Sequence, residues 1–124
     1  MVVPILKQGD VLIASMQAAL SDQDLVHFRD ELADRVGRFR TRGVVIDVTA
    51  LDVLDSFATR TLRAIVSIAK LRGANTVVVG IQPEVAFAMV QLGLNFEGVA
   101  TALDLEEGLD LLASLSTRSG DRGR

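Results

Sequence analysis

Apolar residues recur along this chain with two spacings that alternate, and the alternation predicts strands and helices in turn. Short segments rich in β-branched residues, such as Val44–Val48, are typical of strands buried inside a parallel sheet. Longer segments carry apolar residues three and four positions apart, as expected of helices that bury one face. The predicted elements are strands Val3–Lys7 and Val11–Met16, a helix from Ser21 to a stop near Gly43, strand Val44–Val48, helix Ser56–Leu71, strand Thr76–Ile81, helix Pro83–Gly93, strand Val99–Ala102 and helix Asp104–Leu115.

This order of elements predicts the class of fold. The Gly9-Asp10 turn between the first two strands predicts an antiparallel hairpin. Beyond it, strands alternate with helices, which favours right-handed crossovers and parallel pairing. We therefore predict one α/β domain over residues 1–115, with a mainly parallel sheet, an N-terminal antiparallel hairpin strand and about four covering helices. Residues 116–124 contain no apolar side chain and are predicted to form a disordered C-terminal tail.

Polar side chains gather where the strand Val44–Val48 gives way to the next helix. Asp52 and Asp55 precede Ser56, and the apolar stripe of the helix begins directly afterwards. Either Asp55 or Ser56 is predicted to be the N-cap, because either side chain can accept a hydrogen bond from an unpaired backbone N–H of the first turn. Capping alone is a sufficient reason for such residues, so their spacing by itself does not indicate regulation.

The helix Pro83–Gly93 is apolar nearly all round, although a helix that covers a sheet needs only one apolar stripe. The excess predicts a contact patch for self-association, which we assign to Phe87, Met89 and Val90. The alternative is a helix that its own domain envelops more completely.

Composition and charge narrow the classes of partner. The chain has 124 residues and a net charge of -3, which does not favour nucleic acid or an anionic membrane as a partner. Its basic cluster, Arg35 to Arg42, closes a predicted helix, where cations complement the helix dipole. There is no cysteine, no secretory signal pattern and no apolar run approaching the roughly 18 residues of a membrane span. We expect a soluble, cytoplasmic domain.

Candidate catalytic chemistry is sparse. His27 is the single histidine, it lies mid-helix, and no predicted element brings it to Ser56 as a general base. No ligand pattern for a metal and no glycine-rich nucleotide loop is present, so we expect no enzymatic activity, no metal and no cofactor. The segment VVIDVTALD looks superficially like a phospho-accepting receiver, but the chain has no acidic pair after an early strand, and its only lysines are Lys7 and Lys70.

The order of elements and the Asp55-Ser56 pair at a helix start resemble the STAS domain of bacterial anti-sigma-factor antagonists. The common antagonist motif continues with Ser or Thr and then Gly, whereas this chain has Phe57 and Ala58. Its Asp-Ser-Phe version resembles the RsbS-type scaffold proteins of the stressosome. So do four further segments: PILK at Pro4–Lys7, VVIDVT at Val44–Thr49, GIQPEVA at Gly80–Ala86 and TALDLEEGL at Thr101–Leu109.

The resemblance implies a non-enzymatic scaffold that assembles with RsbR-type STAS sensors into a large hetero-oligomer and sequesters an RsbT-type serine kinase. Phosphorylation of Ser56 would release that kinase, and an RsbX-type phosphatase would be a further partner. We assign the partner contact to residues around that serine: Asp52, Asp55, Ser56, Phe57, Thr59 and Arg60. The competing interpretation is a simple partner-switching antagonist that binds an anti-sigma-factor kinase one-to-one. An enzyme is a third, and it would need an activity that survives Ser56→Ala.

Overall fold

The structure, a computed structural model, describes residues 2–122, with side chains described as far as Leu115. The predicted α/β fold is confirmed, and every predicted strand and helix is present in the predicted order. The elements are β1 (Ile5–Gln8), β2 (Val11–Ser15), α1 (Asp22–Arg38), β3 (Gly43–Asp47), α2 (Ser56–Leu71), β4 (Asn75–Val79), α3 (Pro83–Gln91), β5 (Ala100–Ala102) and α4 (Leu105–Arg122).

The five strands form one sheet in the order β1-β2-β3-β4-β5. β1 pairs with β2 antiparallel, as the hairpin predicted, and the remaining neighbours pair in parallel. The register places Ser15 beside Asp47, Asp47 beside Val79, and Val79 beside Ala102. The parallel strands therefore end level with one another, and the loops that follow them share one edge of the sheet.

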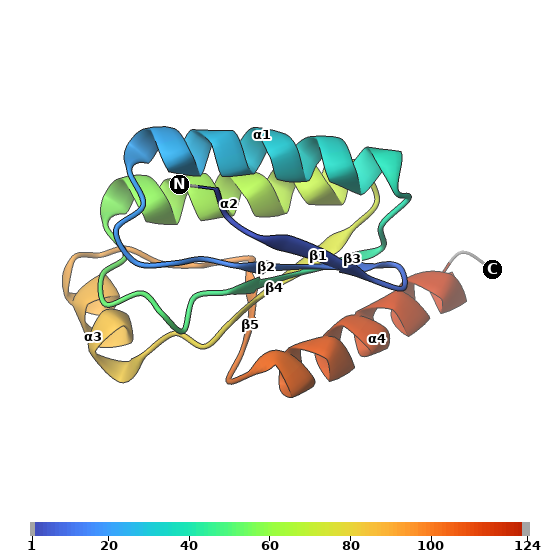
Figure 1. The fold of residues 1–124 in the computed structure, drawn as a ribbon. Helices are drawn as coiled ribbons and strands as arrows, with labels where there is room; N and C mark the ends of the chain where they lie inside the picture. Colours follow the sequence, from blue (N-terminus) through green and yellow to red (C-terminus); the bar gives the residue numbers. More distant parts are fainter. Residues whose placement is uncertain (1, 123–124) are drawn as a thin grey trace.

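Helices cover both faces of this sheet (Figure 1). α1 and α2 lie together on one face, α4 lies on the other, and α3 sits at the end of the sheet where the parallel strands terminate. Alternate residues of β3 pack on opposite faces of the sheet: Ile46 packs on the face covered by α1 and α2, and Val45 packs on the face covered by α4. Both faces of the central strands are thus buried, which explains why Val44, Val45 and Ile46 follow one another without a polar residue between them.

Local signals in the sequence account for the start of α1. Ser21 is the N-cap, and its hydroxyl accepts a hydrogen bond from the backbone N–H of Asp24 at 3.0 Å. The Asp24 carboxylate accepts in return from the backbone N–H of Ser21 at 2.9 Å, which completes a capping box.

The predicted end of the last helix differs from the structure. The sequence predicts an end at Leu115, because the following residues have nothing apolar to bury, but α4 continues to Arg122. No proline interrupts this stretch, and a polar sequence can extend a helix that is already nucleated upstream. The disordered tail predicted for residues 116–124 stays a prediction, since side chains beyond Leu115 and the whole of residues 123 and 124 lie outside what the structure describes.

Candidate functional site

The loop between β3 and α2 lies at the carboxyl edge of the sheet and ends at Ser56. Leu51 and Leu54 anchor this loop, because both side chains are buried in the main hydrophobic core. Asp52 and Val53, which lie between them, are exposed. The loop is therefore fixed to the domain while part of its surface remains open to a partner.

Asp55 is the N-cap of α2. Its backbone is extended (φ -77°, ψ 179°), and its Oδ1 atom accepts a hydrogen bond from the N–H of Ala58 at 2.8 Å. The sequence left Asp55 and Ser56 as alternatives for this role, and the structure selects Asp55. Ser56 is the first helical residue, its side chain is exposed, and no hydrogen bond among the described residues engages its hydroxyl.

The two threonines that follow are in a different situation. Thr59 and Thr61 are buried, and their hydroxyls donate to the backbone carbonyls of Asp55 at 2.9 Å and of Phe57 at 2.8 Å. The prediction that Thr59 belongs to the partner contact is wrong, because its side chain is buried. Thr59 follows Ala58, which belongs to the buried stripe of α2, so it faces the core.

A polar network ties this loop to the start of α3. The Asp47 Oδ1 atom accepts hydrogen bonds from the N–H of Thr49 at 2.9 Å and from its hydroxyl at 2.6 Å. The carbonyl of Thr49 then accepts from Gln82 Nε2 at 2.6 Å, and Gln82 is the N-cap residue of α3. The first half of the loop and the start of α3 are therefore held together.

The remaining predicted contact residues lie around Ser56. Asp52, Asp55 and Arg60 are exposed, and Phe57 is half-buried against the main core. The structure adds Val53, an aliphatic side chain with 73% of its surface exposed, which the sequence analysis did not include. Its place between the anchored Leu51 and Leu54 is the sequence signal that could have found it.

A shallow pocket of about 200 Å³ opens beside the loop. Its lining includes Val53 and Asp55 of the loop, Leu20 just before α1, and Leu25 within α1. Most of its lining residues are apolar, and Asp22 and Asp55 add carboxylates, so the pocket is suited to a protein side chain with an apolar stem and a polar end.

The predicted self-association patch on α3 is only partly exposed. Phe87 and Val90 have 73% and 77% of their surfaces exposed, and Leu92 is also exposed. Met89 was assigned to the same patch, and this was wrong: it is 6% exposed and packs in the core, as does Val85 one turn earlier. α3 therefore has a buried side through Val85 and Met89 and an exposed apolar side through Phe87 and Val90.

Other candidate chemistry does not assemble at this edge. His27 is exposed on α1. Within the part of the chain that the structure describes, no group of three or more histidine, aspartate or glutamate side chains is placed to hold a metal ion. No helix of the described residues is both long and apolar enough to cross a membrane.

Comparison with known proteins identifies the family. The STAS domain family matches residues 3–108 of this chain. Among curated proteins, the RsbT co-antagonist protein RsbRA of Bacillus subtilis is 23% identical over 109 residues, which are 88% of this chain and 40% of RsbRA. The related co-antagonist RsbRD is 31% identical over 64 residues, 52% of this chain and 23% of its own length. The chain therefore spans less than half of the curated relatives that it matches.

Solved structures include two similar chains of matching length. An RsbS variant from Moorella thermoacetica, in which a serine is replaced by glutamate, is 40% identical with a TM-score of 0.80, covering 93% of this chain and 97% of the other. A chain from a structure described as the molecular architecture of the stressosome is 42% identical with a TM-score of 0.77, covering 91% and 98%. The chain belongs to the STAS domain family and is similar to RsbS and to a chain of the stressosome.

Proposed function

We propose that this chain is a non-enzymatic scaffold of an RsbS-type stressosome, which holds an RsbT-type serine kinase and releases it when Ser56 is phosphorylated. One observation carries the proposal: Ser56 presents an exposed and unengaged hydroxyl at the start of α2. The neighbouring hydroxyls of Thr59 and Thr61 are buried and donate to the backbone. A kinase that reaches this edge therefore meets one available acceptor in the first turns of α2.

The fold should tolerate a phosphate at this position. A phosphate adds about -1.5 to -2 charges near neutral pH. At Ser56 that charge would lie beside the first N–H groups of α2 and the positive end of its dipole, a favourable interaction of roughly 0.3–1 kcal/mol at an exposed site. The buried side chains of Leu51 and Leu54 anchor the preceding loop in the core. We therefore expect the loop to keep its position when Ser56 is phosphorylated.

The contact with the kinase should not tolerate it equally. Asp52 and Asp55 are exposed beside Ser56, so the unmodified surface is already acidic. A docked kinase would have to desolvate the added phosphate next to these carboxylates, and the cost of desolvating charges rises when they repel each other. Release then results from electrostatics and sterics at the interface, with no change of fold.

The same proposal includes an assembly. The exposed side chains of Phe87, Val90 and Leu92 form an apolar surface on and just after α3, and such a surface is typical of a protein contact. We assign it to self-association and to contact with RsbR-type STAS domains in the cytoplasm, with an RsbX-type phosphatase returning Ser56 to its unmodified state. A one-to-one antagonist would remain a small complex in light scattering after mixing with an RsbR-type partner, whereas the scaffold forms large particles.

Phosphosite mapping tests the switch. The chain is incubated with an RsbT-type kinase and Mg-ATP, and mass spectrometry is expected to place the phosphate on Ser56. Ser56→Ala should resist modification and stay bound to the kinase. Ser67→Ala is the matched control, because Ser67 is exposed on the same helix and should leave labelling unchanged. A phosphate on other hydroxyls, with Ser56 unmodified, would overturn the assignment.

The non-enzymatic character has its own test. Because neither a base near Ser56 nor a nucleotide loop is present in the sequence, the chain alone should not transfer phosphate to itself. Labelled ATP and Mg²⁺ without a kinase should leave it unlabelled. Stoichiometric label under these conditions would contradict the scaffold proposal.

A further inference from the structure

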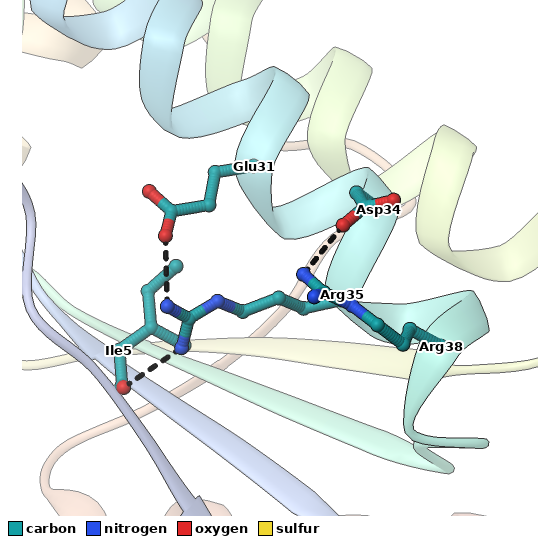
Figure 2. Close-up of polar contacts among 5 residues, drawn as sticks. All are labelled: Ile5, Glu31, Asp34, Arg35 and Arg38. Carbon is teal, nitrogen blue, oxygen red and sulfur yellow. Dashed lines mark hydrogen bonds and ion pairs between the residues drawn. The ribbon is translucent and has the colours of Figure 1, made fainter.

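The free edge of the sheet at β1 is bridged by a side chain from α1. The carbonyl of Pro4 accepts from the N–H of Ser15 at 3.2 Å, so the backbone groups of Pro4, Leu6 and Gln8 face β2. The backbone groups of the alternate residues, Ile5 and Lys7, consequently point away from the sheet. Arg35 Nη1 donates to the carbonyl of Ile5 at 3.3 Å (Figure 2).

This bridge is itself held in place. Arg35 Nη2 lies 2.9 Å from Glu31 Oε1, one turn back on α1, and both side chains are about two-thirds buried. Arg38 makes a comparable pair with Asp34 at 2.6 Å, but that pair is more exposed, and Asp34 is the one partner that Figure 2 marks for Arg38. An uncovered strand edge is a template for the addition of another strand. The added strand would need the outward carbonyl of Ile5 as an acceptor, and Arg35 already donates to that carbonyl.

We propose that the β1 edge is a latent interaction surface for β1 of a second copy of this chain, and that the Glu31–Arg35 pair keeps it closed. The two strands pair antiparallel about a two-fold axis through Leu6. In that register Ile5 of each copy exchanges hydrogen bonds with Lys7 of the other, because these are the residues whose backbone groups point outward.

The side chains fit this arrangement. Leu6 is 66% exposed, on the face of the sheet where α4 packs mainly against β3, β4 and β5. Two-fold pairing makes the two Leu6 residues a directly opposed pair without hydrogen bonds, which brings their side chains closest together. Lys7 faces Ile5 of the copy, so the two lysines do not oppose each other.

The test compares Arg35→Leu with Arg38→Leu, because both remove an arginine from the last turns of α1 and only the first removes the bridge. Every variant also carries Phe87→Asp, so that the contact proposed for α3 does not contribute. The parent protein for this comparison carries Phe87→Asp alone. Light scattering across a concentration series should show the mass of Arg35→Leu rising twofold, while the mass of Arg38→Leu stays equal to that of the parent. The amides of Ile5 and Lys7 should become protected from hydrogen exchange in the larger species.

Two further variants complete the design. Lys7→Pro removes an outward N–H and spares the β1–β2 hydrogen bonds, so Arg35→Leu with Lys7→Pro should return to the parent mass. Glu31→Gln removes the anchor of Arg35 and should associate less strongly than Arg35→Leu; it replaces Arg35→Leu if circular dichroism shows that variant to be unfolded. The proposal would be overturned if Arg35→Leu and Glu31→Gln both had the mass of the parent. It would also be overturned if Arg35→Leu still associated when it carries Lys7→Pro.

Discussion

At the scale of single residues, Ser56 is available because Asp55 caps α2. A serine at the N-cap would direct its own oxygen at a backbone N–H, whereas here the Asp55 carboxylate accepts from Ala58 at 2.8 Å. Thr59 and Thr61 show the opposite case, since the hydroxyl of each is committed to a carbonyl four residues earlier. The Asp-Ser pair therefore divides two tasks between neighbours, with Asp55 stabilising the helix and Ser56 left free.

Removing the cap should cost stability. Asp55→Ala is expected to lower the free energy of unfolding by about 1 kcal/mol, because an N–H in the first turn loses its acceptor. Asp55→Asn retains an acceptor and should cost less. Asp52→Ala, an exposed change in the same loop, should stay within about 0.5 kcal/mol of the parent. Urea unfolding measures all three, and equal losses for Asp52→Ala and Asp55→Ala would contradict this account of the cap.

The close approach of β4 to the loop gives a second prediction. Gly80 has φ +82°, and a Cβ atom there would collide with Thr49 Oγ1. Gly73 has φ +93° with no atom within 4 Å of such a Cβ. Gly73→Ala should therefore cost about 1 kcal/mol of backbone strain, and Gly80→Ala should cost about 1–3 kcal/mol more through overpacking. Thermal unfolding of the two variants compares these costs directly, and similar losses would argue against a tight contact at Thr49.

At the scale of elements, α3 has two apolar sides with different tasks. Val85 and Met89 belong to the core, while Phe87 and Val90 point into solvent. The carbonyl of Thr49 accepts from Gln82, the N-cap of α3, so the helix is fixed beside the loop that ends at Ser56. A partner that covers the exposed side of α3 therefore lies on a rigid part of the same molecular edge.

Substitutions on the two sides of α3 should have different effects. Phe87→Asp is expected to reduce the assembled mass in light scattering with little change in unfolding free energy, because the side chain is already solvated in the isolated domain. Met89→Asp places an unpaired charge in the core and should destabilise the fold by several kcal/mol. Unchanged assembly of a folded Phe87→Asp variant would remove α3 from the interface.

The elements were predictable from the sequence because their signals are local. The β-branched run Val44–Val48 and the cap at Ser21 each depend on neighbouring residues alone. The prediction for Met89 was wrong because α3 has only nine residues and is apolar nearly all round, so its sequence does not indicate which side of the helix is buried. The burial of Thr59 could have been found, since it adjoins Ala58 of that stripe. The bridge from Arg35 to Ile5 joins residues 30 apart, which no local pattern predicts.

At the scale of the whole molecule, parallel register gathers the functional surface at one end. Because Ser15, Asp47, Val79 and Ala102 lie side by side, the loops after these strands open at one edge. The Ser56 loop and α3 both start there, whereas the Arg35 bridge closes the lateral edge at β1. The Ser56 loop and the exposed side of α3 therefore share the carboxyl edge of the sheet, and the β1 edge is a separate surface.

The affinity of an RsbT-type kinase for the unmodified and the Ser56-phosphorylated chain tests the central claim most directly. Calorimetry or surface plasmon resonance gives both dissociation constants, circular dichroism monitors the fold, and Ser67→Asp controls for added charge on α2. We predict that phosphorylation weakens binding at least tenfold, about 1.4 kcal/mol, while the unfolding free energy changes by less than about 1 kcal/mol. Equal affinities for the two forms, or release that occurs only when the domain unfolds, would contradict the account.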